Sequence, residues 1–475
     1  MAQPIAFGSA QRSGLEELAG GGVVAMNVFT DSTGAVRRRP GIVAYAEAPT
    51  EAVDADGISG VFAMDDGKIL AVGAGTKRWV YEVAAGSTRR LSEPLPGLGR
   101  PTFAQTEMLV VMAGGGGMLK YVRSDGSVSL LGGSPPLATH VAASNLRLLG
   151  NDGVLDRTKI RFSDISQGTL SYAGHETWTP TTPPTAGYFT AEAKPDPVAA
   201  IGESNNEIFV WGTQSLQVFS PDPTFIFSPV ASREIGIAAP YSVTKSDQQF
   251  FWLDHLRRFV MGDGRNFNVV SQDLKRTLEQ IDTVDDCFGY RVLTGSLDAM
   301  AFTLPTDGRT FVFQKGSGWA QWSAFGANWA RFPVNAHTFR RDDGANVVGL
   351  TDGRVAKLSL DATTDLGDPI NAYTVTGYEN RDTDMKKHCQ CVRLTLRRGS
   401  TTSSTGPVGF LSWRDKPGPW EPRIPVRLGR SNDTHPVLEF RSLGTYRRRQ
   451  WMFEFSGTED LALISASEDF EVSDQ

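Results

Sequence analysis

The strongest constraint on the fold of this chain is a short strand followed by Asp-Gly, repeated along most of its length. The dipeptide occurs at 56–57, 66–67, 125–126, 152–153, 263–264, 307–308, 343–344 and 352–353. Asp-Gly is favoured in type I′ turns of two-residue β-hairpins, because both central residues need a positive φ. The flanking segments, such as KILAVGA and TFVFQK, are rich in β-branched and aromatic residues and alternate often, as strands do. The pattern predicts one hairpin after another.

Consecutive hairpins over about 310 residues predict a β-propeller, whose four-stranded blades take about 40–50 residues each. Residues 46–365 would then form about six blades, and a set of β-sandwiches is the structural alternative. One helix is expected at 271–281, where Leu274, Leu278 and Ile281 follow helical spacing and Ser271 is placed to cap it. This helix should pack on one face of the propeller.

The pattern changes near residue 365, where Asp-Gly disappears and longer strands such as CQCVRLTLRRG and LALISASEDFEV begin. We interpret residues 366–475 as a C-terminal β-sandwich. Residues 1–45 have neither pattern and read as an extended N-terminal arm. The predicted fold class is therefore all-β, with an arm, a propeller and a sandwich in that order.

Charge is distributed unevenly along a chain whose formal net charge is −6. Residues 381–450 hold 15 Lys and Arg against 6 Asp and Glu, whereas 451–475 hold seven acids and no base. The net charge does not indicate a protein that binds free nucleic acid. A protein that lines a channel for a polyanion can nevertheless combine a near-neutral net charge with such an uneven distribution. Solvated strand faces are the simpler explanation.

Three cysteines among 475 residues do not make a disulfide framework. The N-terminal sequence has no basic segment followed by an apolar one, so no signal peptide is expected. The longest apolar stretches, such as 108–113, are far shorter than the ~20 residues that span a bilayer. We expect synthesis in a reducing host cytoplasm and no membrane insertion.

No catalytic, cofactor or metal site is predicted. His388, Cys389 and Cys391 lie close together, but a zinc site needs about four converging ligands, so buried thiols are favoured. Glycines 114–117 lack the following Gly-Lys-Ser/Thr and helix of a phosphate loop and read as a hairpin. No pair of carboxylates stands out for sugar cleavage, and 412–420 resembles a degenerate Asp-box, which is a structural turn. The chain is not expected to be an enzyme.

Two arginine runs are candidate interface or DNA-channel contacts: Arg37, Arg38, Arg39, Arg447, Arg448 and Arg449. Arg outnumbers Lys about three to one, which favours bidentate contacts with carboxylate or phosphate. On a strand, Arg447 and Arg449 would share a face opposite Arg448. A salt-bridged surface is the alternative.

An ordered set of short motifs over nearly the whole chain resembles the packaged-DNA stabilisation proteins, the tail hubs of short-tailed bacteriophages. The best-defined part is 206–219, followed by 235–243, 251–254 and 269–271. Further matches are Gln11 with Arg12, 27–29, 39–41, 162–164 with Trp178, 318–319 with Trp322, 443–444 with Arg447, and 461–464. The turn at 412–420 departs from the fuller Asp-Asp-Gly-Gly-x-Thr-Trp pattern of relatives, and the family offers no catalytic residues to carry over.

The resemblance implies a propeller plus sandwich that assembles as a homo-hexameric ring in the virion tail. The ring would lie below the portal and adaptor proteins, close the channel for packaged double-stranded DNA, and present tailspikes, fibres or a tail needle. Two rival functions remain. One is a receptor-binding or polysaccharide-degrading tail protein, for which the 10 Trp could stack on sugars. The other is a host regulatory propeller that binds peptides, which has only fold-level analogy behind it.

Overall fold

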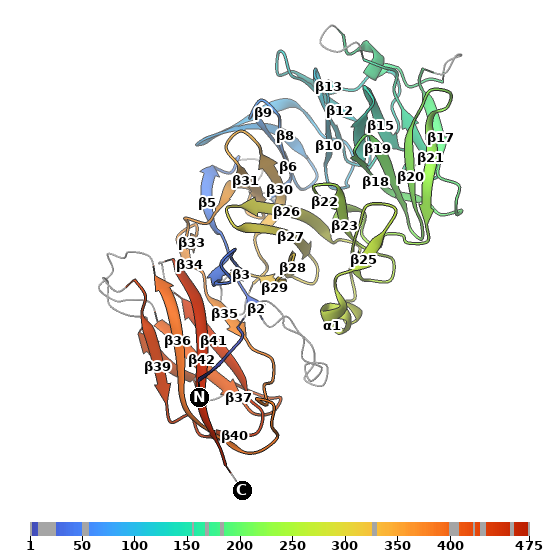
Figure 1. Cartoon of the computed structure of the whole chain (residues 1–475). Coiled ribbons are helices and arrows are strands. Elements are labelled where there is room, and N and C mark those ends of the chain that lie inside the picture. Colours follow the sequence, from blue (N-terminus) through green and yellow to red (C-terminus); the bar gives the residue numbers. More distant parts are fainter. Residues whose placement is uncertain are drawn as a thin grey trace.

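The computed structural model of the protein describes residues 2–7, 25–49, 57–153, 156–166, 171–180, 185–324, 330–398, 408–420, 423–427, 434–456 and 460–473. Gln11, Arg12 and Asp56, which carried part of the sequence argument, lie outside this part of the chain. Nearly all regular structure within it is β-strand. Figure 1 shows a propeller and a sandwich joined into an elongated molecule, with both termini at the sandwich.

Six blades of the propeller each consist of four consecutive antiparallel strands, five as separate sheets and the sixth as part of a longer sheet. The first three consist of β6 (Ile58–Ala63), β7 (Ile69–Gly73), β8 (Trp79–Ala84) and β9 (Ser87–Pro94); β10 (Thr102–Gln105), β11 (Leu109–Ala113), β12 (Leu119–Val122) and β13 (Val128–Leu130); and β14 (Val141–Ser144), β15 (Arg147–Asn151), β16 (Lys159–Phe162) and β17 (Gly187–Thr190).

The next three blades follow the same plan in the second half of the ring. They consist of β18 (Val198–Ser204), β19 (Glu207–Gly212), β20 (Leu216–Asp222) and β21 (Ile226–Arg233); β22 (Thr244–Ser246), β23 (Gln249–Leu253), β24 (Phe259–Gly262) and β25 (Phe267–Val269); and β26 (Phe288–Thr294), β27 (Leu297–Leu304), β28 (Arg309–Gln314) and β29 (Gly318–Trp322). The predicted propeller is thus confirmed. Six of its blades, the expected number, are made of consecutive strands.

A six-stranded sheet closes the ring by combining distant parts of the chain. Its blade consists of β30 (Val334–Arg340), β31 (Ala345–Leu350), β32 (Val355–Ser359) and β5 (Gly41–Ala46), and β33 (Thr364–Asp365) and β34 (Asp368–Pro369) extend the sheet beyond β5. Strand β5 pairs antiparallel with β32, from Gly41 opposite Ser359 to Ala46 opposite Val355. The ring therefore cannot close without residues from the N-terminal segment.

The Asp-Gly pairs do form turns, but the predicted type I′ conformation is wrong. None of the described Asp residues of these pairs has a positive φ. Instead, Asp125 is typical in accepting a hydrogen bond at Oδ1 from the Ser127 backbone N–H (2.8 Å), and in every described pair except 152–153 the glycine alone enters the left-handed region. Positive φ at both central positions occurs at Asn205 (53°) and Asn206 (63°), which join β18 to β19. Asn thus supplies the type I′ geometry expected of Asp-Gly.

The propeller core is a series of apolar clusters, each lying between two neighbouring blades. Between β19 and β23, for example, Trp211 contacts Phe250 and Trp252 edge-on, with ring centroids 5.1 and 5.9 Å apart. Burying one such Phe side chain contributes roughly 1.5–3 kcal/mol. The same between-blade packing recurs from blade to blade.

The predicted helix is present as a 3-10 turn (Gln272–Leu274) followed by α1 (Lys275–Glu279). Leu274, Leu278 and Ile281 are buried as expected, in the core between the fifth and sixth blades. The predicted cap is wrong, because Ser271 makes no capping bond. Its Oγ instead accepts a hydrogen bond from the Phe259 N–H (2.8 Å), which fixes the helix to β24.

The C-terminal part is a sandwich of two sheets that share one core. One sheet orders β3 (Val28–Thr30), β4 (Val36–Arg38), β42 (Leu461–Val472), β36 (Lys387–Arg398) and β39 (Val437–Arg441), with β1 (Ala2–Pro4) on β42 and β40 (Thr445–Tyr446) on β36. The other contains β2 (Ala25–Met26), β35 (Ala372–Val375), β41 (Gln450–Ser456), β37 (Val408–Arg414) and β38 (Arg423–Arg427).

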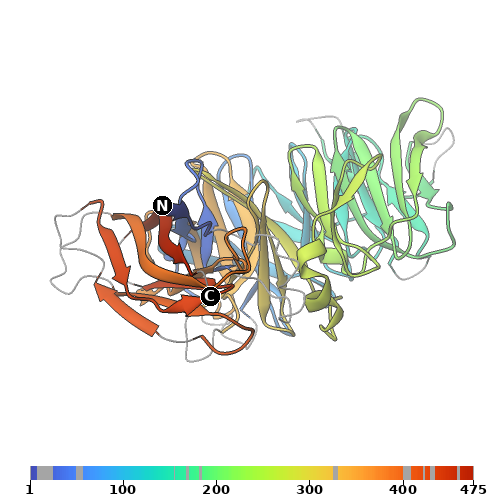
Figure 2. The same cartoon turned by 60° about the horizontal axis from the view of Figure 1, so that its bottom comes forward.

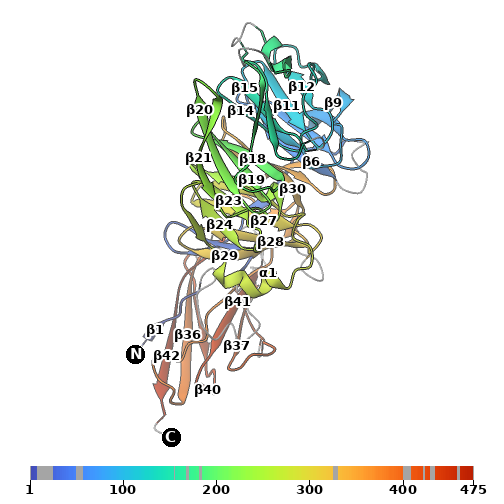
Figure 3. The same ribbon diagram turned by 90° about the vertical axis from the view of Figure 1, so that its right-hand side faces the viewer.

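The N-terminal segment is extended and lies against both parts of the molecule. Strands β1, β3 and β4 belong to the sandwich, β2 lies between the propeller and the sandwich, and β5 belongs to the closing blade. Figures 2 and 3 show these blue strands beside the orange and red strands of the sandwich. The division into residues 1–45, 46–365 and 366–475 stays a prediction about folding units, which strand pairing by itself does not test.

Candidate functional site

One continuous nine-stranded sheet connects the sixth blade to the sandwich. Its order is β26-β27-β28-β29-β2-β35-β41-β37-β38. Strand β2 is the link, because Met26 pairs in parallel with Gln321 of β29 and antiparallel with Tyr373 of β35. Backbone hydrogen bonds therefore run from one part of the molecule into the other. We call the surroundings of β2 the junction.

Asn27 is the polar centre of the junction and is fully buried. Its Oδ1 accepts hydrogen bonds from Arg39 Nε (2.9 Å) and from the Ser323 N–H (2.8 Å), and its Nδ2 donates to the Asn371 carbonyl (2.9 Å). Its φ of 56° lies in the left-handed region, which Asn tolerates better than most residues. One side chain thus ties the N-terminal segment to the sixth blade and to the start of the sandwich.

Arg39 completes the junction with a buried ion pair. Its side chain is 0% exposed and that of Asp365 is 12% exposed. Arg39 Nη1 donates to Asp365 Oδ1 (2.9 Å) and Nη2 donates to the Ser323 carbonyl (3.0 Å), while the guanidinium lies 4.5 Å from the Phe332 ring centre. A buried charge this fully paired is a structural group, so the guanidinium of Arg39 is used inside the chain.

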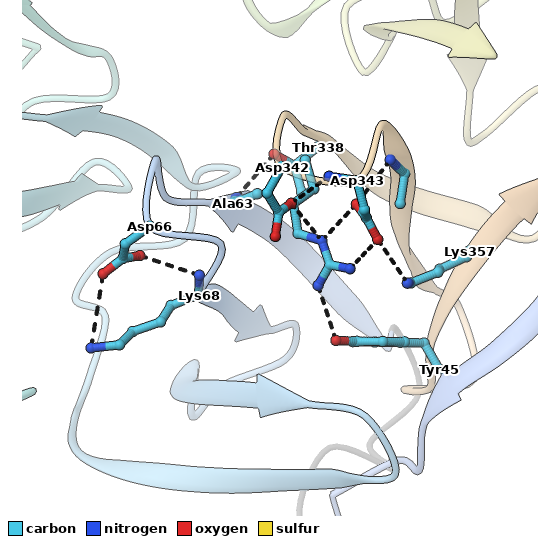
Figure 4. Close-up of polar contacts among 10 residues, drawn as sticks. Tyr45, Ala63, Asp66, Lys68, Thr338, Asp342, Asp343 and Lys357 are labelled. Atoms are coloured by element: carbon cyan, nitrogen blue, oxygen red, sulfur yellow. Dashed lines mark hydrogen bonds and ion pairs between the residues drawn. The ribbon is translucent and has the colours of Figure 1, made fainter. Parts of the chain in front are cut away.

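A second polar cluster, which we call the seam, lies where β5 joins the closing blade (Figure 4). Arg340 donates to Asp343 Oδ1 (2.9 Å) and to the Tyr45 hydroxyl (3.1 Å), and Lys357 Nζ donates to Asp343 Oδ2 (3.4 Å). The hydrogen bond from Arg340 holds the pKa of Asp343 well below its usual value. Lys357 also lies 4.4 Å from the Tyr45 ring centre. The seam fastens β5 on the more exposed side of the blade.

The other residues of the first arginine run lie on the sandwich hairpin. Arg37 Nη2 donates to both carboxylate oxygens of Asp460, each at 2.9 Å. Arg38 is 6% exposed. Contacts of Arg37 and Arg38 with DNA or another subunit stay a prediction.

The second run is divided between exposed and buried positions. Arg447 and Arg448 are exposed and lie near Asp384, whereas Arg449 is buried. Arg449 donates to both oxygens of Asp415 (2.7 and 3.0 Å) and to the Leu443 carbonyl. The expectation that Arg447 and Arg449 share a face is wrong, because the chain bends between β40 and β41. Within this run, Arg447 and Arg448 are the exposed side chains that could contact DNA or another subunit. Such a contact stays a prediction.

The sequence features that might have indicated chemistry have structural roles. Cys389 and Cys391 are buried on β36, where burial raises the pKa of both thiols. Glycines 114–117 form the hairpin between β11 and β12. No group of three or more His, Cys, Asp or Glu able to hold a metal ion occurs among the described residues. In the same part of the chain, no helix has the length and apolar character of a membrane span.

A family model described as "Bacteriophage P22 Gp10, beta-propeller" matches residues 23–359, well over half of the chain. The chain belongs to this family. The match agrees with the resemblance to packaged-DNA stabilisation proteins and makes the chain a bacteriophage structural protein. The matched region begins just before β2 and ends with β32, so it includes the junction residues Asn27 and Arg39.

Comparisons with other known proteins add little. No curated protein matches the chain. A solved structure of BamB from Moraxella catarrhalis is similar over 76% of this chain and 98% of its own, at 10% identity and a TM-score of 0.39, and at that score the likeness carries no argument.

Asn27 is the functional-site residue that sequence reasoning missed. Its sequence signal is its place in the motif at 27–29, which by itself indicates no role. The motifs at 27–29 and 39–41 are close in sequence, and the structure brings both to the junction. Trp322, from the motif that also includes 318–319, lies in the adjacent strand β29. Motifs of a structural family can therefore mark the places where its parts are joined.

Proposed function

We propose that this chain is the tail hub, or nozzle, of a short-tailed bacteriophage virion. Six copies form a ring below the portal and adaptor proteins, close the DNA channel, retain the packaged DNA, and anchor tailspikes, fibres or a tail needle. The family match over residues 23–359 is the observation that carries this proposal. The protein is made in the host cytoplasm and functions in the tail.

The rigid connection of the two parts supports this role. A hub under pressure from packed DNA must transmit force between neighbours without bending, which large interfaces between rigid subunits allow. The nine-stranded sheet and the buried Asn27–Arg39–Asp365 network resist hinging between propeller and sandwich.

The alternative is a receptor-binding or polysaccharide-degrading tail protein on the same propeller. Sugar cleavage needs two carboxylates flanking the bond. A cavity lined by the first strands of the blades lies along the axis of the propeller, and Glu203 is the one carboxylate among the described residues that line it. The geometry thus favours a structural role over a hydrolase.

A nonsense mutation in the gene tests the proposal when the resulting particles are imaged. Heads that package DNA, then leak, and carry nothing below the adaptor are the expected result. Complete tails on full heads that fail to infect would overturn it in favour of receptor binding. The Arg447→Ala/Arg448→Ala variant serves as a milder probe, since both side chains are exposed and the fold should survive. Lower DNA retention is expected if these residues meet DNA or a neighbouring subunit.

A further inference from the structure

A cavity of about 650 Å³ runs along the axis of the propeller. It is lined by the first strand of every blade, β6, β10, β14, β18, β22, β26 and β30, together with the segment before β22. Its size falls within the range of sites that hold small molecules. Several aromatic side chains form its walls, among them Tyr241, Phe288 and Tyr290.

The ionisable side chains that line this cavity are mostly cationic, although the whole chain has a net charge of −6. Arg100, Lys245 and Arg341 line it, against the single carboxylate of Glu203. Burial lowers the pKa of His140 and of His337 to about 4, so both are neutral at pH 7. The lining therefore attracts anions.

These three cations differ from most arginines of the chain. Arg37, Arg123 and Arg291 are examples of the usual arrangement, in which a carboxylate lies within 4 Å. Among the described residues, no ion pair involves Arg100, Lys245 or Arg341. Lys245 Nζ donates to the backbone carbonyl of Glu203 (3.1 Å), and the Glu203 carboxylate accepts the Asn206 N–H (2.8 Å). The three cations therefore exceed the single lining carboxylate, and none of them forms an ion pair with it.

Arg100 is the most constrained of the three. Its guanidinium lies over the Phe288 ring, 3.8 Å from the centroid, and Nη2 donates to the Asn335 carbonyl. Burial, followed by the nearby cation Arg331, lowers the pKa of Arg100 to about 10. Among the groups that raise this pKa, the carboxylate of Asp286 has the smallest effect. A guanidinium has five donors, and the others on Arg100 meet no acceptor among the described residues. Arg100 is half-buried, and none of its nitrogens is among the buried side-chain atoms that have no partner, so the remaining donors stay accessible and can pair with an anion.

We propose that the axial cavity is a binding site for a small organic anion whose carboxylate or phosphate group pairs with Arg100. The planar guanidinium fits either group through two parallel hydrogen bonds. The aromatic walls suit an apolar or ring-shaped body attached to that group. Lys245 and Arg341, which are exposed, increase attraction at the mouth. The site does not depend on the place of the chain in a virion.

Isothermal titration calorimetry on the full chain tests the site with two probes, citrate and inorganic phosphate, at constant ionic strength. We expect one-to-one binding of at least one probe, and the tighter one identifies carboxylate or phosphate as the preferred group. Arg100→Gln should weaken that binding by at least about tenfold, the effect of losing charge-assisted hydrogen bonds. Arg276→Gln on α1 removes the same charge from an exposed position far from the cavity lining and should leave binding unchanged.

A second variant protects the test from a folding defect. If Arg100→Gln is not folded by circular dichroism, the Lys245→Gln/Arg341→Gln double variant replaces it, because both side chains are exposed. That variant should weaken binding about twofold to fivefold through loss of attraction at the mouth. Absence of binding for both probes at about 10 mM, or equal affinity in wild type and variant, would overturn the proposal.

Discussion

The junction and the seam both attach the N-terminal segment to distant parts of the chain, but they do so in different surroundings. At the junction, the side chain of Arg39 is 0% exposed and that of Asp365 is 12% exposed. At the seam, the side chain of Asp343 is 38% exposed and that of Arg340 is 13% exposed. Water can replace a lost partner at the seam and cannot do so at the junction. Equal-looking ion pairs should therefore differ several-fold in their effect on stability.

The largest effect is expected from Arg39→Ala, at about 3–5 kcal/mol of unfolding free energy. The substitution leaves the Asp365 carboxylate without its donor and removes one of the two donors to Asn27 Oδ1, which keeps the Ser323 N–H. Urea unfolding of the purified chain measures the loss. The Arg39→Ala/Asp365→Ala double variant is the control, and it should be more stable than the single variant because no lone charge remains buried. A single-variant loss below about 1 kcal/mol would mean that water reaches the junction.

Asn27→Gly should have the next largest effect, about 1–3 kcal/mol, the cost of unsatisfied buried hydrogen bonds. Glycine keeps the positive φ of Asn27 without strain, so the loss reports the side-chain contacts alone. Asn145→Gly is the matched control, since Asn145 has a φ of 50° in an exposed turn. The same unfolding midpoints for both variants would show that Asn27 contributes only its backbone conformation.

The sequence predicted the repeated elements well and the joints between them poorly. Strand alternation and hairpin turns are local, so the propeller, the sandwich and the buried face of α1 could all be inferred. Strand β5 closes the ring by pairing with β32, and β2 pairs with β29. Each of these pairings joins segments about 300 residues apart, which local patterns do not encode. The two arginine runs illustrate the limit, because Arg39 and Arg449 are buried and Arg448 is exposed, although each run looks uniform in sequence.

Arg340→Ala at the seam should cost about 1 kcal/mol or less. Its partners Asp343 and Tyr45 keep access to water or to Lys357. The effect should shrink as sodium chloride rises, since salt screens exposed pairs. Thermal melts of wild type and variant at low and high salt measure it. A loss as large as that of Arg39→Ala, independent of salt, would remove the distinction between the two regions.

The smallest effect is the pH dependence of the seam. The pKa of Asp343 lies below its usual 3.8 because Arg340 donates to it, so the folded state favours the charged carboxylate. This stabilisation is complete above pH 3.8 and is lost as the pH falls through the lowered pKa, because the unfolded state binds the proton first. Wild type and Asp343→Asn should differ in melting temperature above pH 4 and converge below it.

That comparison must be separated from the titration of three buried histidines. Burial lowers the pKa values of His140, His175 and His337 from 6.5 to about 4. Between those values the unfolded chain binds more protons, so both proteins lose stability as the pH falls from 6.5 to 4. The histidine effect is common to wild type and Asp343→Asn and cancels in the difference between them. A difference that stays constant from pH 6 down to the lowest pH measured would mean that the pKa of Asp343 is not lowered, and that the seam depends on the contacts with the Tyr45 ring instead.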